Sequence, residues 1–288
     1  MKIASNKIND VINYFKAQLK DLYPMDEIQS FIYLSFKHYL DLSATDLVLS
    51  KDKHMSESEL LKFNFAVKDL KRYMPIQYIL GETEFYGLKI KVDPSVLIPR
   101  PETEELVDWI IKDFKNESKI LNIKDICTGS GCIAIALEKN LPNSVVSAID
   151  ISEDALETAK KNAILNNSAI SFSLEDALAE IKREEKYDII VSNPPYVTEG
   201  EKSLMQENVL DYEPHLALFV DNKDALKFYA AIAKWAYMHL KEKGKLYFEI
   251  NEAKSQELTS LLAILGYKNI EVKKDLNEKH RMISATIK

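Results

Sequence analysis

The chain has 288 residues, of which 46% are hydrophobic and 29% charged, and its formal net charge is −7. This length allows about two domains of globular composition, and the acidic balance argues against broad nucleic-acid binding. The two cysteines, Cys127 and Cys132, are too few for a disulfide framework. Charges interrupt every apolar run, and the N-terminus has no apolar signal-peptide core, so we expect a cytoplasmic protein with no membrane segment.

Residues 1–74 are expected to form an N-terminal helical-bundle domain. Apolar side chains recur at i, i+3 and i+4 within residues 8–19 and 25–40. Ser56 and Glu59 form the S-x-x-E capping-box pattern ahead of a third helix. The aromatic residues of this domain are interpreted as its core, with a recognition surface as the alternative.

Residues 75–100 predict a β-hairpin connector between two domains. Residues 88–92 alternate apolar and charged side chains after Gly87, which is typical of a strand. Residues 78–81 together with 84–87 are expected to supply its hairpin partner. A helix then begins at Pro101, since Pro followed by Glu is favoured in a first helical turn.

The remainder of the chain, residues 101–288, is expected to form one α/β domain. Predicted strands alternate with predicted helices, which indicates a doubly wound and mostly parallel sheet. The strands are expected at residues 120–128, 145–151, 170–176, 187–193, 244–251 and 282–288. The helices are expected at residues 132–140, 153–167, 176–185, 224–243 and 254–266.

A glycine-containing loop follows the first of these strands, in the stretch DICTGSGCIAIAL. Gly129 and Gly131 allow a sharp turn that leaves backbone N–H groups and a helix N-terminus facing a ligand. Asp150 ends the next strand and can accept hydrogen bonds from two ribose hydroxyls. Glu175 and Asp176 end the third strand, where a carboxylate can accept from an adenine amino group. This arrangement suits either a dinucleotide or S-adenosylmethionine, and the loop alone does not choose between them.

The fourth strand ends in Asn193, Pro194, Pro195 and Tyr196. A proline is enough to end a strand, so strand termination does not explain this combination of four residues. Two acceptors, the Asn193 side-chain oxygen and the Pro194 backbone oxygen, could hold a planar NH₂ group in the pyramidal form that attacks a methyl group. The two prolines would stiffen the loop before substrate arrives. Tyr196 could provide a flat wall for a planar amide or base.

Such a site needs no strong general base. An amide nitrogen is cationic and very acidic once it carries the methyl group, so water or a carbonyl can take its proton. Alignment and electrostatic stabilisation would then supply most of the rate.

The glycine loop, Asp150 and the NPPY sequence together resemble a class I S-adenosylmethionine-dependent methyltransferase that acts on a planar nitrogen. From about residue 75 to the C-terminus, the chain is similar to the release factor glutamine methyltransferases. The segments that carry this resemblance are PIQYILGETEFYG, LIPRPETEELV, DICTGSGCIAIAL, VSNPPYV, YEPHLAL and VKKDLNEKHRMISA.

This resemblance implies methyl transfer from S-adenosylmethionine to the side-chain amide nitrogen (N5) of the Gln in the Gly-Gly-Gln motif of peptide-chain release factors. It implies cofactor contacts from a set of loop and strand-end residues, namely Cys127, Thr128, Gly129, Ser130, Gly131, Asp150, Asp176, Ala177 and Asn193. It implies a substrate clamp formed by Asn193, Pro194, Pro195 and Tyr196, with Arg100 and Glu102 lining the same cleft. The N-terminal domain would bind the release factor, and we expect a monomer with no metal ion.

Two positions depart from the pattern that this resemblance implies. Cys127 stands where many methyltransferases have glycine, and Ala177 stands where some relatives place an aromatic side chain against the adenine. Another residue must therefore provide the adenine contact.

Three alternatives remain open from the sequence. An adenine-N6 nucleic-acid methyltransferase uses a similar loop, but it would need a basic groove for phosphates. A nicotinamide oxidoreductase would use the same glycine pattern but has no need of NPPY. A binding protein with an inactive cofactor pocket is the third.

Overall fold

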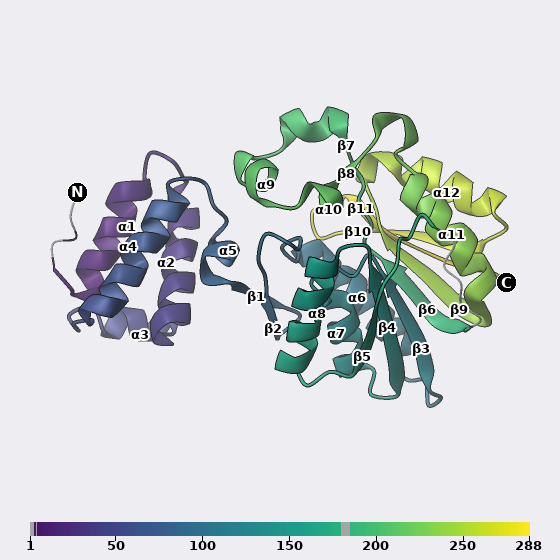
Figure 1. The fold of residues 1–288 in the computed structure, drawn as a ribbon, viewed down its shortest axis with the longest axis horizontal. Coiled ribbons are helices and arrows are strands. Elements are labelled where there is room, and N and C mark those ends of the chain that lie inside the picture. Colours follow the sequence, from purple (N-terminus) through teal and green to yellow (C-terminus); the bar gives the residue numbers. More distant parts are fainter. Residues whose placement is uncertain (1–2, 4, 180–184) are drawn as a thin grey trace. The chain divides into compact units, whose positions relative to one another are not determined.

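The computed structural model describes residue 3, residues 5–179 and residues 185–288, and the chain divides into two compact units. Unit 1 comprises Met1–Gly81 and Gln206–Tyr212, and unit 2 comprises Glu82–Met205 and Glu213–Lys288 (Figure 1). Each unit contains its own cluster of buried hydrophobic side chains. The two units are therefore described separately.

Unit 1 is a small helical bundle. Its helices are α1 (Ile8–Leu19), α2 (Met25–Leu40), α3 (Ala44–Leu49), α4 (Glu57–Leu70), α5 (Ile76–Leu80) and α9 (Glu207–Tyr212). The bounds of α1 and α2 agree with the sequence prediction, and the expected capping box of Ser56 and Glu59 starts α4. Helix α3 was not predicted, although Ser43 and Asp46 form an equivalent box at its start.

Most aromatic side chains of unit 1 belong to its core. Phe36 and Phe63 are fully buried, with ring centroids 4.4 Å apart. Tyr33 and Tyr39 are partly buried and pack against the same cluster, whereas the side chain of Phe65 is 52% exposed. The core interpretation is confirmed for Tyr33, Phe36, Tyr39 and Phe63. Of these five aromatic residues, Phe65 is the mostly exposed one.

Helix α9 joins unit 1 from a distant part of the sequence. The Tyr212 hydroxyl donates a hydrogen bond to the Arg72 carbonyl oxygen at 2.6 Å. No sequence pattern predicts this association, because α9 is short and has no buried residues.

Unit 2 begins with a β-hairpin. Strands β1 (Glu82–Phe85) and β2 (Leu88–Lys91) pair antiparallel, and Tyr86 and Gly87 form the two-residue turn with φ of 50° and 73°. Positive φ at both turn positions matches the twist of the flanking strands. The prediction that residues 78–81 belong to the hairpin was wrong, because they end α5, where Gly81 adopts the left-handed conformation.

The centre of unit 2 is a seven-stranded sheet in the order β10-β11-β9-β6-β3-β4-β5. Its strands are β3 (Leu121–Ile126), β4 (Ser144–Asp150), β5 (Ile170–Leu174), β6 (Tyr187–Ser192), β9 (Leu240–Glu249), β10 (Lys268–Lys274) and β11 (His280–Thr286). The five strands from β9 to β5 run parallel, and β11 and β10 add an antiparallel edge. The predicted doubly wound fold is confirmed, and the strand order reverses between β3 and β6.

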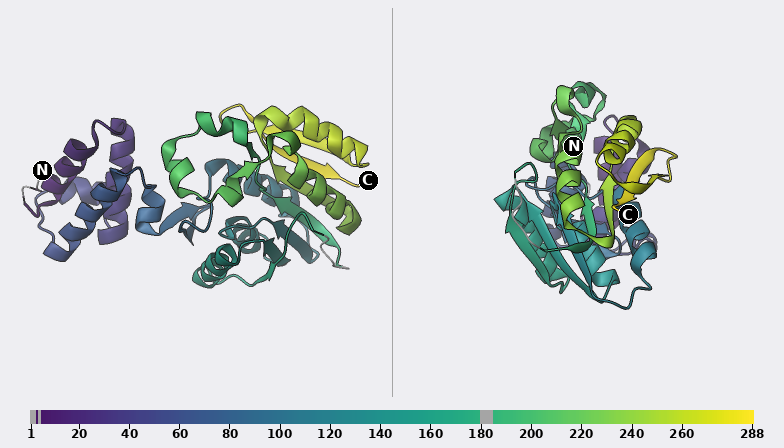
Figure 2. Two further views of the ribbon diagram at one scale, coloured as in Figure 1. Left: turned by 45° about the horizontal axis from the view of Figure 1, so that its top comes forward. Right: turned by 90° about the vertical axis from the view of Figure 1, so that its right-hand side faces the viewer.

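Helices cover both faces of this sheet. They are α6 (Pro101–Phe114), α7 (Cys132–Asn140), α8 (Glu153–Leu165), α11 (Lys227–His239) and α12 (Ser255–Ile264). Figure 2 shows α11 and α12 on the face opposite to α7 and α8. Connecting elements complete the unit, namely β7 (Val197–Thr198), η1 (Glu199–Leu204), α10 (His215–Leu218), β8 (Phe219–Val220), η2 (Asn222–Asp224) and η3 (Glu252–Lys254).

Two predicted helices differ from the structure. The helix expected to reach residue 243 ends at His239, because Leu240 already pairs with Tyr187 of β6. Of the helix expected at residues 176–185, the described part, 176–179, ends in a turn, and residues 180–184 lie outside the described part of the chain. Strand β10 was not predicted.

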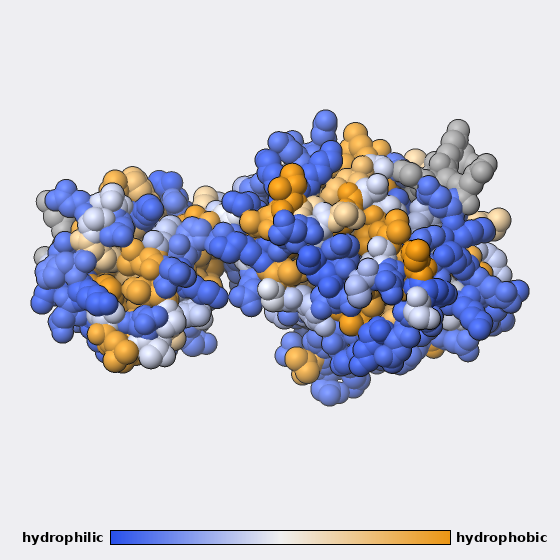
Figure 3. All heavy atoms as spheres, turned by 90° about the horizontal axis from the view of Figure 1, so that it is seen from below, coloured by the Kyte–Doolittle hydropathy of each residue, from blue (hydrophilic) through white to orange (hydrophobic). Residues whose placement is uncertain are grey.

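The surface is mainly hydrophilic on the face drawn in Figure 3, with separate smaller hydrophobic areas. Among the described residues, we find no helix whose length and apolar character would let it cross a membrane.

Candidate active site

A cavity of about 260 Å³ lies at the carboxyl ends of the parallel strands of unit 2. It is next to the point between β3 and β6 where the strand order reverses, which is where open α/β sheets bind ligands. Its lining includes ten of the residues singled out from the sequence, namely Arg100, Cys127, Thr128, Gly129, Ser130, Asp150, Asp176, Ala177, Asn193 and Pro195. These residues are dispersed in the sequence, and the parallel strands bring their ends together at one edge.

The glycine loop turns sharply between β3 and α7. Cys127, Gly129 and Gly131 all have left-handed φ values, of 62°, 54° and 80°. The Thr128 N–H donates to the Ile149 carbonyl oxygen at 3.0 Å, which ties the loop to β4. The backbone at Cys127 therefore has a conformation that glycine adopts more easily, which accounts for the glycine that many methyltransferases have at this position.

Gly131 is placed differently from the other loop residues. It does not line the cavity, and a Cβ atom on it would lie 3.1 Å from the Ala159 Cβ atom. Gly131 therefore allows α7 to begin close against α8, which fixes the direction of the helix N-terminus.

Asp150 connects the loop with the end of β4. One carboxylate oxygen accepts from the Gly129 N–H at 2.8 Å, and the other accepts from the Ser152 N–H at 3.0 Å. Burial raises the pKa of Asp150, and the backbone donors oppose that shift. Because each carboxylate oxygen can accept a second hydrogen bond, this side chain fits the two hydroxyls of a ribose.

The other end of the cavity is largely apolar. Asp176 follows β5 and accepts from the Leu178 N–H at 2.8 Å, while Ala177 is buried in the core of the unit. Ile151 and Leu178 also line the cavity and remain 49% and 42% exposed. These two side chains could supply the apolar contact to an adenine that Ala177 is too small to make alone.

The NPPY loop leaves the end of β6 beside the glycine loop. Asn193 and Pro195 line the cavity, and Pro194 between them is buried. The Asn193 side-chain NH₂ group donates to the Thr103 hydroxyl oxygen at 3.3 Å. Asn193 therefore lies beside the same cavity as Gly129 and Asp150.

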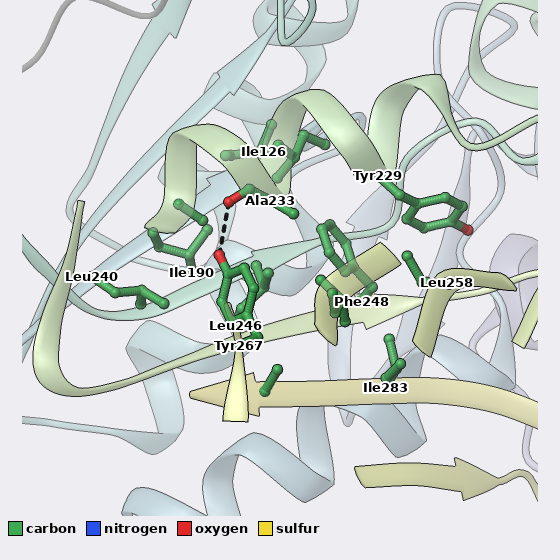
Figure 4. Packing of buried hydrophobic residues seen from close by; sticks show 14 of the residues in the cluster. Ile126, Ile190, Tyr229, Ala233, Leu240, Leu246, Phe248, Leu258, Tyr267 and Ile283 are labelled. Atoms are coloured by element: carbon green, nitrogen blue, oxygen red, sulfur yellow. Dashed lines mark hydrogen bonds between the residues drawn. The ribbon is translucent and has the colours of Figure 1, made fainter. Parts of the chain in front are cut away.

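Tyr196 is directed away from the cavity. Its hydroxyl donates to a Glu249 carboxylate oxygen at 3.1 Å, and its ring packs against the core of unit 2. Tyr229 and Phe248 of this core make an edge-to-face pair with ring centroids 5.2 Å apart (Figure 4). Burial and the Glu249 charge raise the pKa of Tyr196 well above its usual value, so its hydroxyl remains protonated and able to donate.

Arg100 lines the cavity, but its charge is already paired. Its guanidinium lies 2.5 Å from a carboxylate oxygen of Glu213, and the other oxygen of Glu213 accepts from the Ile98 N–H at 3.2 Å. The ion pair holds the segment before α6 against the segment before α10. Glu102 is not part of the lining.

Sequence reasoning missed three residues that support the site: Thr103, Glu213 and Glu249. The first two lie in segments that carried the family resemblance, IPRPETE and YEPHLAL, so this signal was available. Glu249 ends the central strand β9 and is 1% exposed, and no motif in the sequence marks it.

The cysteines have no metal-binding arrangement. Both are free, and burial raises the pKa of each thiol, so both are neutral. Among the described residues, no three His, Cys, Asp or Glu side chains are grouped as metal ligands.

The reversed strand order, the glycine loop and the strand-end carboxylates define a class I methyltransferase, and its methyl donor is S-adenosylmethionine. The sequence matches the family described as methyltransferase small domain over residues 106–217 and the PrmC N-terminal domain over residues 10–81. Both matches agree with the division into a helical unit and an α/β unit.

The named relatives show which family of class I methyltransferases this chain resembles. The chain is 48% identical to the release factor glutamine methyltransferase of Flavobacterium psychrophilum, over 95% of this chain and 97% of that protein. It is 43% identical to the enzyme of that name from Bacteroides thetaiotaomicron, over 96% and 99% of the two chains. A solved methyltransferase structure from Pyrococcus furiosus, 19% identical with a TM-score of 0.52 over 81% of this chain and 99% of that one, shares the fold. The chain belongs to the release factor glutamine methyltransferase family.

Proposed function

We propose that this enzyme methylates the side-chain amide nitrogen (N5) of the Gln in the Gly-Gly-Gln motif of peptide-chain release factors. The observation that carries the proposal is the position of Asn193, which lines the same cavity as Gly129 and Asp150. A planar NH₂ group held by Asn193 would thus lie next to the methyl donor. The relatives are named for methylation of a release factor glutamine, which supports this class of substrate.

S-adenosylmethionine supplies a methyl group on a positively charged sulfur that is a good leaving group. Gly129 and Asp150 would hold its nucleoside and amino acid portions, and Ile151 and Leu178 would flank the adenine. The Asn193 side-chain oxygen and the Pro194 carbonyl oxygen would each accept one hydrogen of the substrate amide. In this arrangement the nitrogen would form a bond to the methyl carbon as the bond from that carbon to sulfur breaks.

The proton on the product nitrogen needs no dedicated base. The N-methylated amide cation is a strong acid, so it loses its proton to water or to one of the two acceptor oxygens. Tyr196 is not required for this step, because its hydroxyl donates to Glu249 and its pKa is raised. The contribution of the chain is therefore alignment and stabilisation of positive charge.

Unit 1 would bind the release factor away from its Gln. Its helices α3 and α4 carry apolar side chains that are exposed and lie outside the core, namely Val48 (62% exposed), Leu49 (79%), Leu61 (51%) and Phe65 (52%). Exchange of Leu49 and Phe65 for serine is expected to raise KM for the release factor severalfold. The affinity for the methyl donor should stay unchanged, and an equal loss of both would assign unit 1 a purely structural role.

The function is tested by methyl transfer from labelled S-adenosylmethionine. Purified release factor, its variant with Ala in place of the Gly-Gly-Gln glutamine, and duplex DNA are offered separately. We expect label on the natural factor alone. Label on the Ala variant would place the reaction at another residue, and label on DNA would favour the adenine-N6 alternative.

A further inference from the structure

Beneath the NPPY loop, a hydrogen-bonded chain of side chains connects α6, β6 and β9. Its members are Asn193, Thr103, Glu249 and Tyr196, and it extends from the cavity into the core. We propose that Glu249, acting through Thr103, fixes which end of the Asn193 amide faces the substrate. Glu249 and Thr103 are thus positioning residues for the proposed reaction, on which this inference rests.

Glu249 can only accept hydrogen bonds when it is ionised. One of its oxygens accepts from the Thr103 hydroxyl at 2.5 Å and the other from the Tyr196 hydroxyl at 3.1 Å. Both side chains are donors with a single proton. Burial raises the pKa of Glu249, and these two hydrogen bonds and the charge of Arg281 oppose that shift and favour the carboxylate. Because Glu249 is 1% exposed, water does not compete with either donor.

The direction of the next hydrogen bond follows from this one. The only proton of the Thr103 hydroxyl is given to Glu249, so towards Asn193 its oxygen can only accept. Asn193 must therefore turn its NH₂ group to Thr103, and the two groups lie 3.3 Å apart. The amide oxygen of Asn193 is left for the cavity side, which is the acceptor that a substrate NH₂ group requires.

Without these hydrogen bonds, nothing fixes which end of the Asn193 side-chain amide faces the cavity. Its oxygen and NH₂ end have nearly the same shape, so packing distinguishes them poorly and hydrogen bonding decides. If the NH₂ end faced the cavity, two donors would meet at the substrate nitrogen. A site with that orientation would still bind both substrates but would not favour the reactive form of the amide.

Glu249 also holds the far end of the NPPY loop through the Tyr196 hydroxyl. The Tyr196 carbonyl oxygen accepts from the Asn251 side chain at 3.3 Å, so the loop has a second anchor that does not involve Glu249. Loss of the Glu249 charge alone should therefore leave the loop in place. The effect on the orientation of the Asn193 amide can thus be distinguished from a general loosening of the NPPY loop.

Three variants test this series of hydrogen bonds. Glu249→Gln keeps the shape but adds a donor, which allows the Thr103 proton to point to Asn193. Thr103→Val keeps the volume but removes the hydroxyl, and Thr103→Ser keeps the hydroxyl. The control is Thr286→Val, which removes a buried threonine hydroxyl from β11. Thr286 pairs with Lys245, at the end of the β9 pairing away from Glu249.

The first two variants are expected to lower kcat at least about tenfold, with less than about a threefold change in KM for the release factor or in donor affinity. The kcat of Thr103→Ser should stay within about threefold of that of the natural enzyme. The double variant that combines Glu249→Gln with Thr103→Val should lose no more kcat than the more impaired of the two single variants. A kcat for Thr103→Ser as low as that of Thr103→Val, or additive losses in the double variant, would overturn the proposal. So would an equal loss in Thr286→Val.

A second readout does not depend on the substrate. The side-chain NH₂ resonance of Asn193, identified by its absence in Asn193→Ala, should show a hydrogen-bonded proton in the natural protein and in Thr103→Ser but not in Thr103→Val. An unchanged resonance in Thr103→Val would contradict the orientation itself. If the resonance behaves as expected while no release factor is methylated, the proposed function fails and the positioning chain stands.

Discussion

The backbone N–H of Gly129 donates to the carboxylate of Asp150 at 2.8 Å. The bond joins the loop after β3 to the end of β4, and the Ser152 N–H occupies the other carboxylate oxygen. The residue proposed to hold the ribose thus also fixes the loop that faces the rest of the methyl donor. Loss of Asp150 should affect both parts of the binding site together.

The variant Asp150→Ala is expected to weaken S-adenosylmethionine binding by about 1 to 3 kcal/mol, or roughly 5- to 150-fold in Kd, because hydrogen bonds to a charged acceptor are lost. Calorimetric titration of the donor measures this change. Asp154→Ala, which removes an exposed carboxylate from the first turn of α8, is the matched control. An unaltered Kd in Asp150→Ala would refute the ribose assignment.

Asn193→Ala should separate catalysis from binding. Removal of one acceptor aimed at the reacting nitrogen is expected to lower kcat about 100-fold or more, with donor affinity unchanged. Single-turnover methyl transfer and donor titration measure the two effects. Asn143→Ala, at an exposed position before β4, should match the natural enzyme. Full turnover by Asn193→Ala would exclude the amide clamp.

Glu213→Ala should destabilise unit 2. It leaves the Arg100 guanidinium unpaired in the cavity wall and the Ile98 N–H without its acceptor. We expect a loss of about 1 to 3 kcal/mol in the free energy of unfolding, because Arg100 is only partly exposed. Denaturant unfolding measures the loss, and Arg100→Met combined with Glu213→Ala should cost less than the sum of the two single changes.

An exposed ion pair provides the control for this experiment. Glu157 and Lys161 lie on the surface of α8, and Glu157→Ala should change the free energy of unfolding by less than about 1 kcal/mol. Equal losses in Glu157→Ala and Glu213→Ala would mean that burial of Glu213 has no special effect.

Asp125 should make stability dependent on pH. Burial raises the pKa of this fully buried carboxyl from 3.8 to about 7. Because the unfolded chain releases the proton near pH 4 and the folded chain near pH 7, this contribution to stability is complete below pH 4 and is lost as pH rises to 7. Its total is up to about 4 kcal/mol, at about 1.4 kcal/mol per pKa unit.

The variant Asp125→Asn removes this titration. Relative to the natural protein, its free energy of unfolding should be higher at pH 8 than at pH 5, as measured by denaturant unfolding at the two pH values. A difference that does not change with pH would show that Asp125 is ionised throughout.

The sequence alone was sufficient for elements that depend on local patterns. Helices α1 and α2 were predicted to the residue, because their apolar spacing and end signals are contained within 12 and 16 residues. The capping box of Ser56 and Glu59 is equally local. The alternation of strands and helices likewise predicted the fold class. The cofactor was predicted from the family resemblance, because the glycine loop alone suits a dinucleotide equally well.

Tertiary structure decided the features that depend on partners far away in sequence. Leu240 was predicted helical but is a strand because β6 offers hydrogen-bonding groups beside it. Thr103 meets Glu249 across 146 residues, and Arg100 meets Glu213 across 113. A hydrogen bond or ion pair of this kind has no periodic signature, because its geometry is set by the packing of α6, β9 and the connecting loops. The sequence by itself predicted the fold class and the loops that line the cavity, and only the folded sheet decided which way their side chains face.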